Sequence, residues 1–241
     1  MKGLILAGGT GSRLLPLTKV TNKHLLPVYD KPMIYYPLES LKSAGITDIM
    51  IITGTHHAGN IFSLLGSGNE YGVKFTYKVQ DEAGGIPQAI SLAEDFVGND
   101  SFISINGDNI IFESLKPFAK EFEKEKDAMQ ILLYKGTEEE AKKSGVAVCE
   151  GKKVTNVIEK QKNPPAKNII IGIYFMKPSV FDVIKKIKPS ARGETEITDV
   201  QKHYLQKRTL KADYLKGKWL DAGDFEDLLH ANLETKKFME K

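Results

Sequence analysis

The sequence predicts an α/β protein with a doubly wound, mostly parallel sheet, helices on both faces of that sheet and a small antiparallel insertion. In the first half of the chain, short apolar runs alternate with amphipathic segments of helix length. Near-continuous hydrophobic strands separated by helices are typical of a parallel sheet that is covered on both faces. The first apolar run ends in three glycines within four positions, which indicates a turn with unusual backbone demands.

The first half contains four expected strands and three expected helices. The strands lie at residues 3–7, 48–53, 73–79 and 101–106, and the helices at residues 33–44, 57–65 and 87–97. Pro87 falls in the first turn of its helix, a favoured position for proline, and Pro37 marks a place where the first helix can bend. Ligands of doubly wound sheets bind beyond the carboxyl ends of the strands, so the loops after these strands are the expected binding loops.

The second half is less regular and carries the antiparallel insertion. Helices are expected at residues 114–126, from Pro178 onward and at 224–236, and strands at residues 128–134, 146–150, 153–158 and 169–176. Gly151 and Lys152 separate two of these strands and predict a hairpin turn. Residues 190–199 form a polar loop that leads into a further helix, with Thr195 or Glu196 near its cap. We expect a single domain over residues 1–241.

Composition and charge exclude several classes of protein. Of the 241 residues, 41% are hydrophobic and 27% charged, and the formal charge of +3 is spread along the chain, so no nucleic-acid partner is expected. No apolar run reaches the length that spans a membrane, so no membrane partner is expected. The single cysteine, Cys149, rules out an internal disulfide, and no signal-peptide pattern opens the chain; the expected location is the cytoplasm.

The glycine-rich segment after the first strand has the chemistry of a polyphosphate loop. Gly8, Gly9 and Gly11 expose backbone N–H groups, and Arg13 and Lys23 add positive charge. The spacing matches neither common design. The dinucleotide pattern needs glycine at residue 14, and the phosphate-loop pattern started from Gly8 needs glycine at Arg13. The alternative is a tight turn that merely requires glycine, but the two cations favour phosphate binding.

Two carboxylates stand at ends of apolar stretches. Asp108 follows Gly107 after the fourth strand, and Asp221 ends another apolar stretch. Mg²⁺ commonly takes one or two protein carboxylates together with phosphate oxygens, so the pair suits a metal–nucleotide site. The alternatives are an ordinary Asp/Asn turn at Asp108 and, for Asp221, a cap on the helix that begins near Asp224.

Three further loops carry candidate binding groups. Gln80 can read the edge of a thymine or uracil base, with Gly85 allowing close approach, although a flexible loop is the simpler interpretation. Glu159 can accept from sugar hydroxyls and Lys160 can hold a phosphate, and the alternative there is a surface ion pair. Arg192 is a second candidate for anion binding.

Taken together, these motifs resemble the sugar-phosphate nucleotidyltransferase family, in its thymidylyl variety, over nearly the whole chain. The matching segments are Leu6–Leu14 with Pro16-Leu17-Thr18, Lys23–Pro27, Tyr29–Tyr35, Val79-Gln80, Gly107-Asp108-Asn109, Glu159-Lys160, Ser190–Glu194 and Trp219–Gly223. The sequence departs from the family at Gln161, where proline is usual, and at Asn106, where an apolar residue is common. The resemblance implies a Rossmann-like fold whose insertion binds sugar, with the nucleotide held by about residues 1–110 and the sugar by about residues 111–241.

The resemblance also implies roles for individual residues. It places Leu6, Gly8, Gly9, Arg13, Lys23, Gln80, Gly85 and Asp108 on the nucleotide. It places Asn109, Gly145, Glu159, Lys160, Ile170, Gly172 and Arg192 on the sugar phosphate. The implied catalytic residues are Arg13, Lys23, Asp108, Lys160 and Asp221, of which Asp108 and Asp221 bind Mg²⁺.

The implied substrates are dTTP and α-D-glucose 1-phosphate, which give dTDP-glucose and pyrophosphate. An enzyme that uses UTP stays open, because Gln80 would read thymine and uracil alike. A non-catalytic sensor of nucleotide sugars also stays open, although a sensor has no need for both Asp108 and Asp221. A dinucleotide-dependent oxidoreductase is disfavoured by Leu14. A homo-oligomer is compatible with the resemblance.

Overall fold

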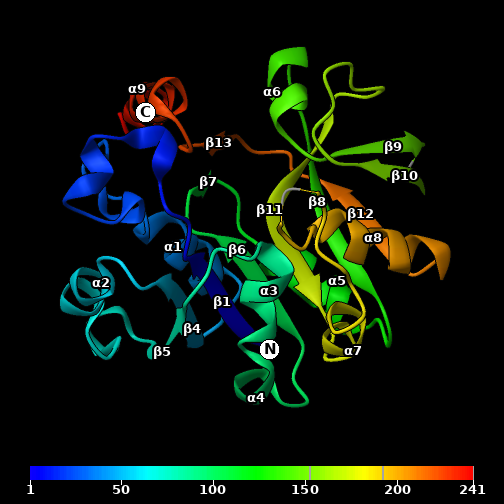
Figure 1. The fold of residues 1–241 in the computed structure, drawn as a ribbon, viewed down its shortest axis with the longest axis horizontal. Helices are drawn as coiled ribbons and strands as arrows, with labels where there is room; N and C mark the ends of the chain where they lie inside the picture. Colours follow the sequence, from blue (N-terminus) through cyan, green and yellow to red (C-terminus); the bar gives the residue numbers. More distant parts are fainter. Residues whose placement is uncertain (152, 192, 241) are drawn as a thin grey trace.

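The structure, a computed structural model, describes residues 1–151, 153–191 and 193–240. Within these residues, nine strands form one sheet in the order β10-β9-β11-β6-β1-β4-β5, with β8 pairing β11 and β12 pairing β8 (Figure 1). The strands of this sheet are β1 (Lys2–Ala7), β4 (Asp48–Gly54), β5 (Lys74–Gln80), β6 (Phe102–Asn106), β8 (Met129–Lys135), β9 (Val146–Glu150), β10 (Lys153–Ile158), β11 (Asn168–Met176) and β12 (Leu210–Tyr214).

Helices and short strands complete the fold. The α-helices are α1 (Tyr35–Ser43), α2 (Ala58–Leu65), α3 (Ile86–Ser91), α4 (Glu94–Val97), α5 (Lys116–Glu123), α6 (Glu138–Lys143), α7 (Val180–Ile184), α8 (Ile197–Gln206) and α9 (Phe225–Met239). Short 3-10 helices lie at Ser12–Leu14, Leu17–Lys19, Lys23–Leu25 and Asn69–Tyr71. Two small antiparallel sheets pair β2 (Pro27–Val28) with β3 (Lys31–Pro32) and β7 (Asn109–Ile111) with β13 (Trp219–Asp221).

The parallel part of the sheet positions the ligand loops. Strands β6, β1, β4 and β5 are parallel neighbours, with Leu6 opposite both Ile52 and Asn106. Their carboxyl ends therefore reach the same edge, where Gly107 donates its backbone N–H to the carbonyl of Leu6 at 2.9 Å. The loops that follow β1 and β6 meet at this edge, as the doubly wound arrangement predicts.

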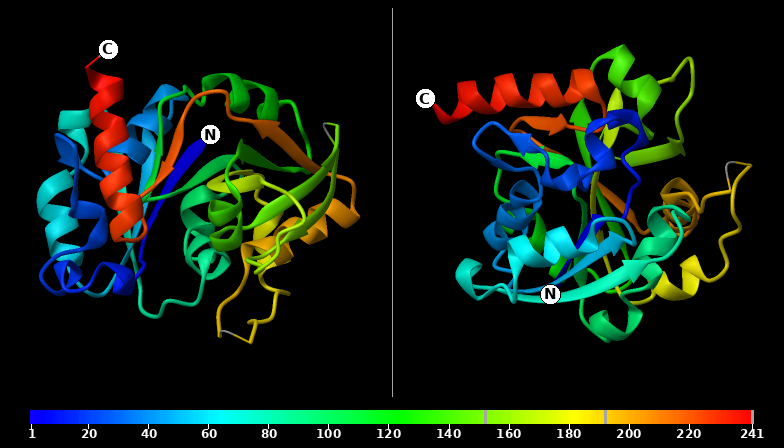
Figure 2. Two further views of the ribbon diagram at one scale, coloured as in Figure 1. Left: turned by 90° about the horizontal axis from the view of Figure 1, so that it is seen from above. Right: turned by 60° about the vertical axis from the view of Figure 1, so that its left-hand side comes forward.

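Helices cover both faces of the sheet, which confirms the expected fold class (Figure 2). Along β1, Leu4 and Leu6 join the core cluster that also contains residues of α3, α7 and α8. Ile5 and Ala7 join the cluster on the other face, with residues of α1, α2 and α5. Because successive side chains of a strand point to opposite faces, an apolar strand of this kind is buried on both sides.

Some elements differ from the expectation in their boundaries. The helix expected over residues 87–97 divides into α3 and α4, with Leu92 and Ala93 between them. Pro37 lies in the first turn of α1, where its missing N–H removes no helical hydrogen bond, and that helix begins at Tyr35. The hairpin β9–β10 matches its expected boundaries but extends the main sheet; Lys152 of its turn lies outside the described residues.

Several elements were not expected from the sequence. Strand β12 lies parallel to β8, and β7 pairs with β13 so that Asn109 faces Asp221. Helix α6 begins at a capping box formed by Thr137 and Glu140. The β7–β13 pairing matters most for function, because it brings two of the predicted site segments together from positions more than a hundred residues apart.

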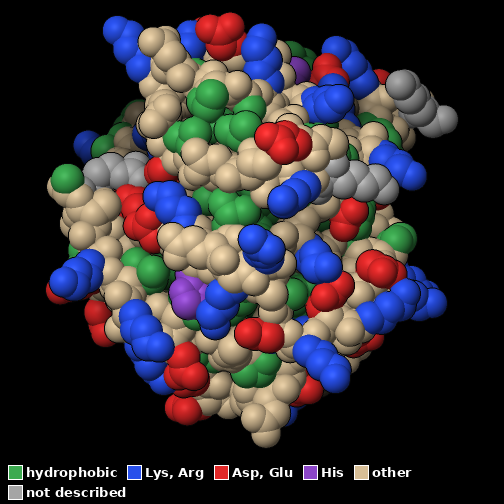
Figure 3. Space-filling model, turned by 90° about the vertical axis from the view of Figure 1, so that its right-hand side faces the viewer, with side chains coloured by type: hydrophobic (Ala, Val, Ile, Leu, Met, Phe, Trp, Pro, Cys, Tyr) green, Lys and Arg blue, Asp and Glu red, His purple; other side chains and the backbone are tan. Residues whose placement is uncertain are grey.

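The outer surface agrees with the charge pattern of the sequence. Basic and acidic side chains are interspersed across the face drawn in Figure 3. Among the described residues, no helix is both long and apolar enough to cross a membrane.

Candidate active site

Two adjoining cavities lie at the carboxyl edge of the parallel strands. The first, of about 300 Å³, is lined by the residues predicted for the nucleotide: Leu6, Gly8, Gly9, Arg13, Lys23, Gln80, Gly85 and Asp108. The second, of about 190 Å³, is lined by Asn109, Gly145, Glu159, Lys160, Ile170, Gly172 and Asp221. The cavities share Arg13, Ile86, Asn106 and Asp108. The remaining predicted residue, Arg192, lies outside the described residues.

The glycine loop has steric reasons for its glycines. A Cβ at residue 8 would lie 2.2 Å from Oε1 of Gln80, so only glycine lets the base-side glutamine approach the loop. Gly11 has φ +66° and a Cβ there would lie 2.8 Å from a methyl of Thr18, whose hydroxyl donates to the Gly11 carbonyl at 2.9 Å. The loop therefore packs closely against its neighbours, and Arg13 follows it as an exposed cation that lines both cavities.

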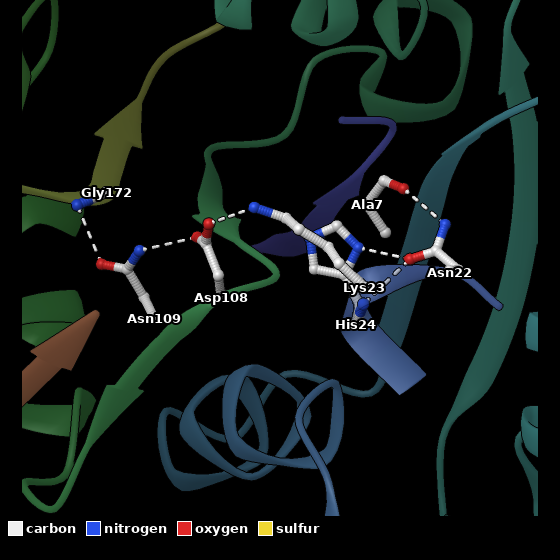
Figure 4. Close-up of polar contacts among 7 residues, drawn as sticks. All are labelled: Ala7, Asn22, Lys23, His24, Asp108, Asn109 and Gly172. Carbon is white, nitrogen blue, oxygen red and sulfur yellow. Dashed lines mark hydrogen bonds and ion pairs between the residues drawn. The ribbon is translucent and has the colours of Figure 1, made fainter. Parts of the chain in front are cut away.

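Lys23 and Asp108 form the ion pair at the meeting point of the two cavities (Figure 4). Lys23 Nζ lies 2.5 Å from Asp108 Oδ2, and the side chains are only 11% and 14% exposed. The lysine opens a short 3-10 helix that Asn22 caps by accepting from the backbone N–H of His24. Asn22 also donates to the Ala7 carbonyl at 3.3 Å, so the cation is positioned from the end of β1.

The His24 ring packs against the backbone at Gly107 and stays neutral. Its Nδ1 donates to Asn22 Oδ1 at 2.7 Å, and a Cβ on Gly107 would lie 2.6 Å from its ring. Burial, reinforced by the charge of Lys23, lowers the pKa of His24 to about 3. The imidazole therefore packs under the Gly107-Asp108 peptide as an uncharged group, and Gly107 is needed for it to fit.

The two carboxylates have opposite titration behaviour. Burial alone would raise the pKa of Asp108, but the charge and hydrogen bond of Lys23 outweigh it and hold the pKa below the usual range. For Asp221, burial and then the nearby charge of Asp108 raise the pKa to about 7. Asp108 is thus held as an anion, and the anionic form of Asp221 is destabilised by burial and then by the charge of Asp108.

Asn109 connects Asp108 to the sugar-side strands. Its Nδ2 donates to Asp108 Oδ1 at 3.2 Å, while its Oδ1 accepts from the backbone N–H of Gly172 at 3.0 Å and from Trp219 Nε1 at 2.8 Å. A Cβ on Gly172 would lie 2.4 Å from Nδ2 of Asn106, which accounts for glycine in the middle of β11. Gly107 and Asp108 form the turn between β6 and β7 that the sequence allows, and both oxygens of Asp108 accept from side chains.

Asp221 places its carboxylate at the sugar-side cavity. It lies on β13 opposite Asn109, and its Oδ1 is buried without a hydrogen-bond partner among the described residues. The cap of α9 is Asp224, which accepts from the backbone N–H of Asp227, so the capping alternative for Asp221 is wrong. An orphaned buried oxygen beside a second carboxylate fits a divalent cation of the Mg²⁺ type, which needs few protein ligands.

The sugar-side cavity also contains polar groups that sequence reasoning did not single out. Gln201 is fully buried, and its amide oxygen and nitrogen have no hydrogen-bond partner among the described residues; the Thr198 hydroxyl is in the same state. Both line the cavity together with Glu159 and Lys160, whose ion pair spans 3.6 Å. In the sequence, Thr198 and Gln201 are distinguished only by lying three residues apart on one helix face, and this spacing is equally typical of an ordinary helix.

On the base side, residue 85 is glycine for a structural reason that differs from the expected approach of a base. It has φ +96°, and a Cβ there would lie 2.2 Å from the backbone oxygen of Thr195. Gln80 is buried and donates through Nε2 to Gln88 Oε1 at 2.5 Å. Thr195, from the second half of the chain, therefore contacts this loop at Gly84 and the helix that follows it at Gln88.

A doubly wound sheet whose carboxyl edge carries a glycine loop, the cations Arg13 and Lys23 and two carboxylates defines a nucleotide-dependent transferase. The nucleotidyl transferase family model matches residues 2–237, and the chain belongs to this family. It is 42% identical over 234 residues to the low-salt glycan biosynthesis nucleotidyltransferase Agl11 of Haloferax volcanii, covering 96% of this chain and 65% of that protein. It is 39% identical over 234 residues to glucose-1-phosphate thymidylyltransferase of Neisseria meningitidis, covering 96% and 81%.

Solved structures show the same relationship. A candidate glucose-1-phosphate thymidylyltransferase of Bacillus anthracis, crystallised with sucrose, superposes with a TM-score of 0.93 at 50% identity, covering 97% of this chain and 94% of that chain. A UDP-glucose pyrophosphorylase in complex with UDP-glucose superposes with a TM-score of 0.86 at 27% identity, covering 98% of each chain. The protein is therefore a nucleotidyltransferase of the Rossmann-like fold, as the sequence motifs imply.

Proposed function

We propose that the protein transfers a thymidylyl group from dTTP to α-D-glucose 1-phosphate, giving dTDP-glucose and pyrophosphate. One observation carries this proposal: the cavity predicted for the nucleotide and the cavity predicted for the sugar phosphate meet at Arg13 and Asp108. The Neisseria meningitidis relative and the Bacillus anthracis structure both match nearly the whole chain. Both carry the name glucose-1-phosphate thymidylyltransferase, which supports the choice of substrates.

The reaction needs positioning and charge more than acid–base chemistry. A phosphate oxygen of the sugar phosphate bonds to the α-phosphorus of dTTP, and the bond from that phosphorus to the bridging oxygen of the β-phosphate breaks. Pyrophosphate leaves with that oxygen and its electron pair. The nucleophile is already an anion, so no base is required, and the main obstacle is the repulsion between two anionic substrates.

The cations of the site would reduce the repulsion between the two anionic substrates. Arg13 lines both cavities and would contact the triphosphate, and Lys23 lies beside Asp108 where the reacting phosphates would meet. Lys160 is half exposed at the sugar side and would hold the phosphate of the second substrate. Backbone N–H groups of the Gly8–Gly9 segment would add hydrogen bonds to the triphosphate.

Asp108 and Asp221 would hold Mg²⁺. The buried, unpartnered Oδ1 of Asp221 and the position of both carboxylates on one cavity support this assignment. When bound, the cation neutralises charge on the phosphates and favours the departure of pyrophosphate. Lys23 pairs with Asp108 in the chain without ligands, so the site is close to electrically balanced before substrates arrive.

A second candidate uses UTP in place of dTTP. Gln80 offers an amide that reads groups common to thymine and uracil, and the UDP-glucose pyrophosphorylase neighbour favours this alternative. Its lower identity, 27% against 50% for the thymidylyltransferase neighbour, makes dTTP the preferred assignment. The cytoplasmic location, the oligomeric state and the division near residue 110 stay predictions.

The test is pyrophosphate release with glucose 1-phosphate, Mg²⁺ and each of dTTP, UTP, ATP, CTP and GTP in turn. We expect release with dTTP to exceed release with the other four. Equal rates with dTTP and UTP would remove the nucleotide assignment alone. No release with any nucleotide would contradict the enzymatic function and leave a sensor of nucleotide sugars.

A further inference from the structure

Helix α3 begins at the base-side loop without a capping side chain of its own. Its N-cap residue is Gly85, which has no side chain to accept from the free N–H groups of the first turn. One of these groups, the backbone N–H of Gln88, instead donates to Thr195 Oγ1 at 3.2 Å, 107 positions further along the chain. A threonine from the second half of the protein thus performs the capping that a local serine or threonine usually performs.

The same threonine holds the loop in front of the helix. Thr195 Oγ1 donates to the carbonyl of Gly84 at 2.8 Å, and its backbone N–H donates to that carbonyl at 2.9 Å. Gly85 adopts φ +96°, and a Cβ there would lie 2.2 Å from the Thr195 carbonyl oxygen. A hydroxyl can donate one hydrogen bond and accept another at the same time, so a single side chain makes both the loop contact and the cap.

The capped residue is also the residue that orients Gln80. Gln88 accepts through Oε1 from Gln80 Nε2 at 2.5 Å. Gln80 is 6% exposed, and its Oε1 lies against the glycine loop, where a Cβ on Gly8 would be 2.2 Å away. Two hydrogen bonds, one to the backbone and one to the side chain of Gln88, therefore link the Thr195 hydroxyl to Gln80 at the nucleotide cavity.

We infer that Thr195 is a positioning residue for nucleotide recognition: its hydroxyl fixes Gln88, and Gln88 fixes the amide of Gln80. This inference rests on the proposed function, because it assigns Gln80 to the base. The Gly84 contact made by the Thr195 backbone does not need the hydroxyl, so the side chain itself adds the link to Gln88. Loss of the hydroxyl should leave the fold unchanged and weaken binding of the nucleotide but not of the sugar phosphate.

The test compares Thr195→Val, which removes the hydroxyl at nearly constant shape, with Thr195→Ser, which keeps it. We expect Thr195→Val to raise KM for dTTP about 10-fold, the scale of one lost hydrogen bond to a buried group. We expect kcat and KM for glucose 1-phosphate to stay within about twofold, because the substitution changes no contact of Arg13, Lys23 or Asp108. Thr195→Ser should restore KM for dTTP. The control is Thr155→Val, which removes a hydroxyl bonded to the Val148 carbonyl on the β9–β10 hairpin.

A second variant protects the test against a general loss of structure. Gln88→Leu breaks the next link, and we expect the same rise in KM for dTTP, with no further rise in the Thr195→Val/Gln88→Leu double variant, since both act through Gln80. An unchanged KM for dTTP in Thr195→Val, equal rises for both substrates, additive effects in the double variant, or failure of Thr195→Ser to restore KM would each overturn the inference.

Calorimetric titration with dTTP and Mg²⁺ separates this inference from the proposed function. If the wild-type protein releases no pyrophosphate, the proposed function fails, while the dissociation constants for dTTP still decide the role of Thr195. A roughly 10-fold weaker dTTP complex in Thr195→Val than in wild type and Thr195→Ser supports the inference. Equal dissociation constants in all three proteins would overturn it.

Discussion

Lys23 and Asp108 lie 2.5 Å apart as a largely buried ion pair at the point where the two cavities meet. Each partner is predicted to bind something else during the reaction, the lysine a phosphate and the aspartate a cation. The pair keeps both groups charged and in position while the site holds no ligand, because neither would be stable alone in a buried environment. When substrate and cation bind, Lys23 and Asp108 would therefore change partners without either group having to gain or lose a proton.

Asp108→Asn should remove nearly all activity. The substitution keeps the shape but removes the negative charge that faces Lys23 and would bind the cation. We expect kcat to fall by about 1,000-fold or more, the scale at which a central electrostatic group contributes. Asp199→Asn is the control, since Asp199 forms an exposed pair with Lys202 on α8, and its kcat should stay near that of wild type. Comparable losses in both variants would discredit the metal assignment.

Asp221→Asn should stabilise the metal-free protein in a pH-dependent way. The folded pKa of about 7 lies above the unfolded value of 3.8, so ionisation favours the unfolded state as pH rises through this window. The variant's advantage in free energy of unfolding should be absent below pH 4, grow up to pH 7 and then level off, at a size on the order of 4 kcal/mol.

Urea denaturation at pH 4, 6 and 8 without divalent cations measures this difference. Addition of Mg²⁺ at pH 8 should stabilise wild type and leave Asp221→Asn nearly unchanged, because the cation would relieve the repulsion between the two carboxylates. A difference between the proteins that does not vary with pH would show that Asp221 is not destabilised as an anion.

His24→Gln should remove an acid sensitivity of the fold. The folded pKa of about 3 lies below the unfolded value of 6.5, so wild type loses stability as pH falls from 6.5 towards 3. Between pH 7 and pH 5 the expected contribution of this residue is about 2 kcal/mol. The glutamine variant should show a shallower decline in free energy of unfolding over the same range. Parallel curves for the two proteins would indicate that His24 ionises normally in the folded state.

Gln201→Leu should make the protein more stable and a poorer enzyme. The buried amide has no partner among the described residues, so replacing it with an apolar group of similar size removes a desolvation penalty. We expect KM for glucose 1-phosphate to rise about 10-fold, because the amide would lose a sugar hydroxyl partner. The contrasting variant is Gln130→Leu, whose buried amide bonds to Asp213, and it should be destabilised. A less stable Gln201→Leu protein with unchanged KM would contradict the sugar-side role.

Local patterns predicted most of the fold. The parallel strands are apolar runs between glycines and amphipathic segments, and this signal is strong wherever a strand is buried on both faces. Strand β12 was missed although alternate residues of Leu210–Tyr214 are apolar, because a pattern of only five residues at a sheet edge is a weak signal. Strands β7 and β13 are three residues long, too short for any period to show, and they pair across the chain.

The motifs predicted which residues line the site but not how those residues are held. All of the predicted residues that the structure describes line the two cavities. The contact between Thr195 and Gln88, and the bond from Trp219 to Asn109, join residues about 110 positions apart. No local pattern encodes such contacts. The close approach of the Thr195 backbone to Gly85 and of the Asn106 side chain to Gly172 accounts for these two glycines, which sequence reasoning had attributed to ligand approach or left unexplained.

The central claim is that an oxygen of glucose 1-phosphate attacks the α-phosphorus of dTTP. It is tested most directly with glucose 1-phosphate whose three non-bridging phosphate oxygens are ¹⁸O, followed by mass spectrometry of the products formed with dTTP and Mg²⁺. The account predicts dTDP-glucose that retains all three labelled oxygens and pyrophosphate that carries none. Label in pyrophosphate, loss of label from the sugar nucleotide, or no sugar nucleotide at all would contradict it.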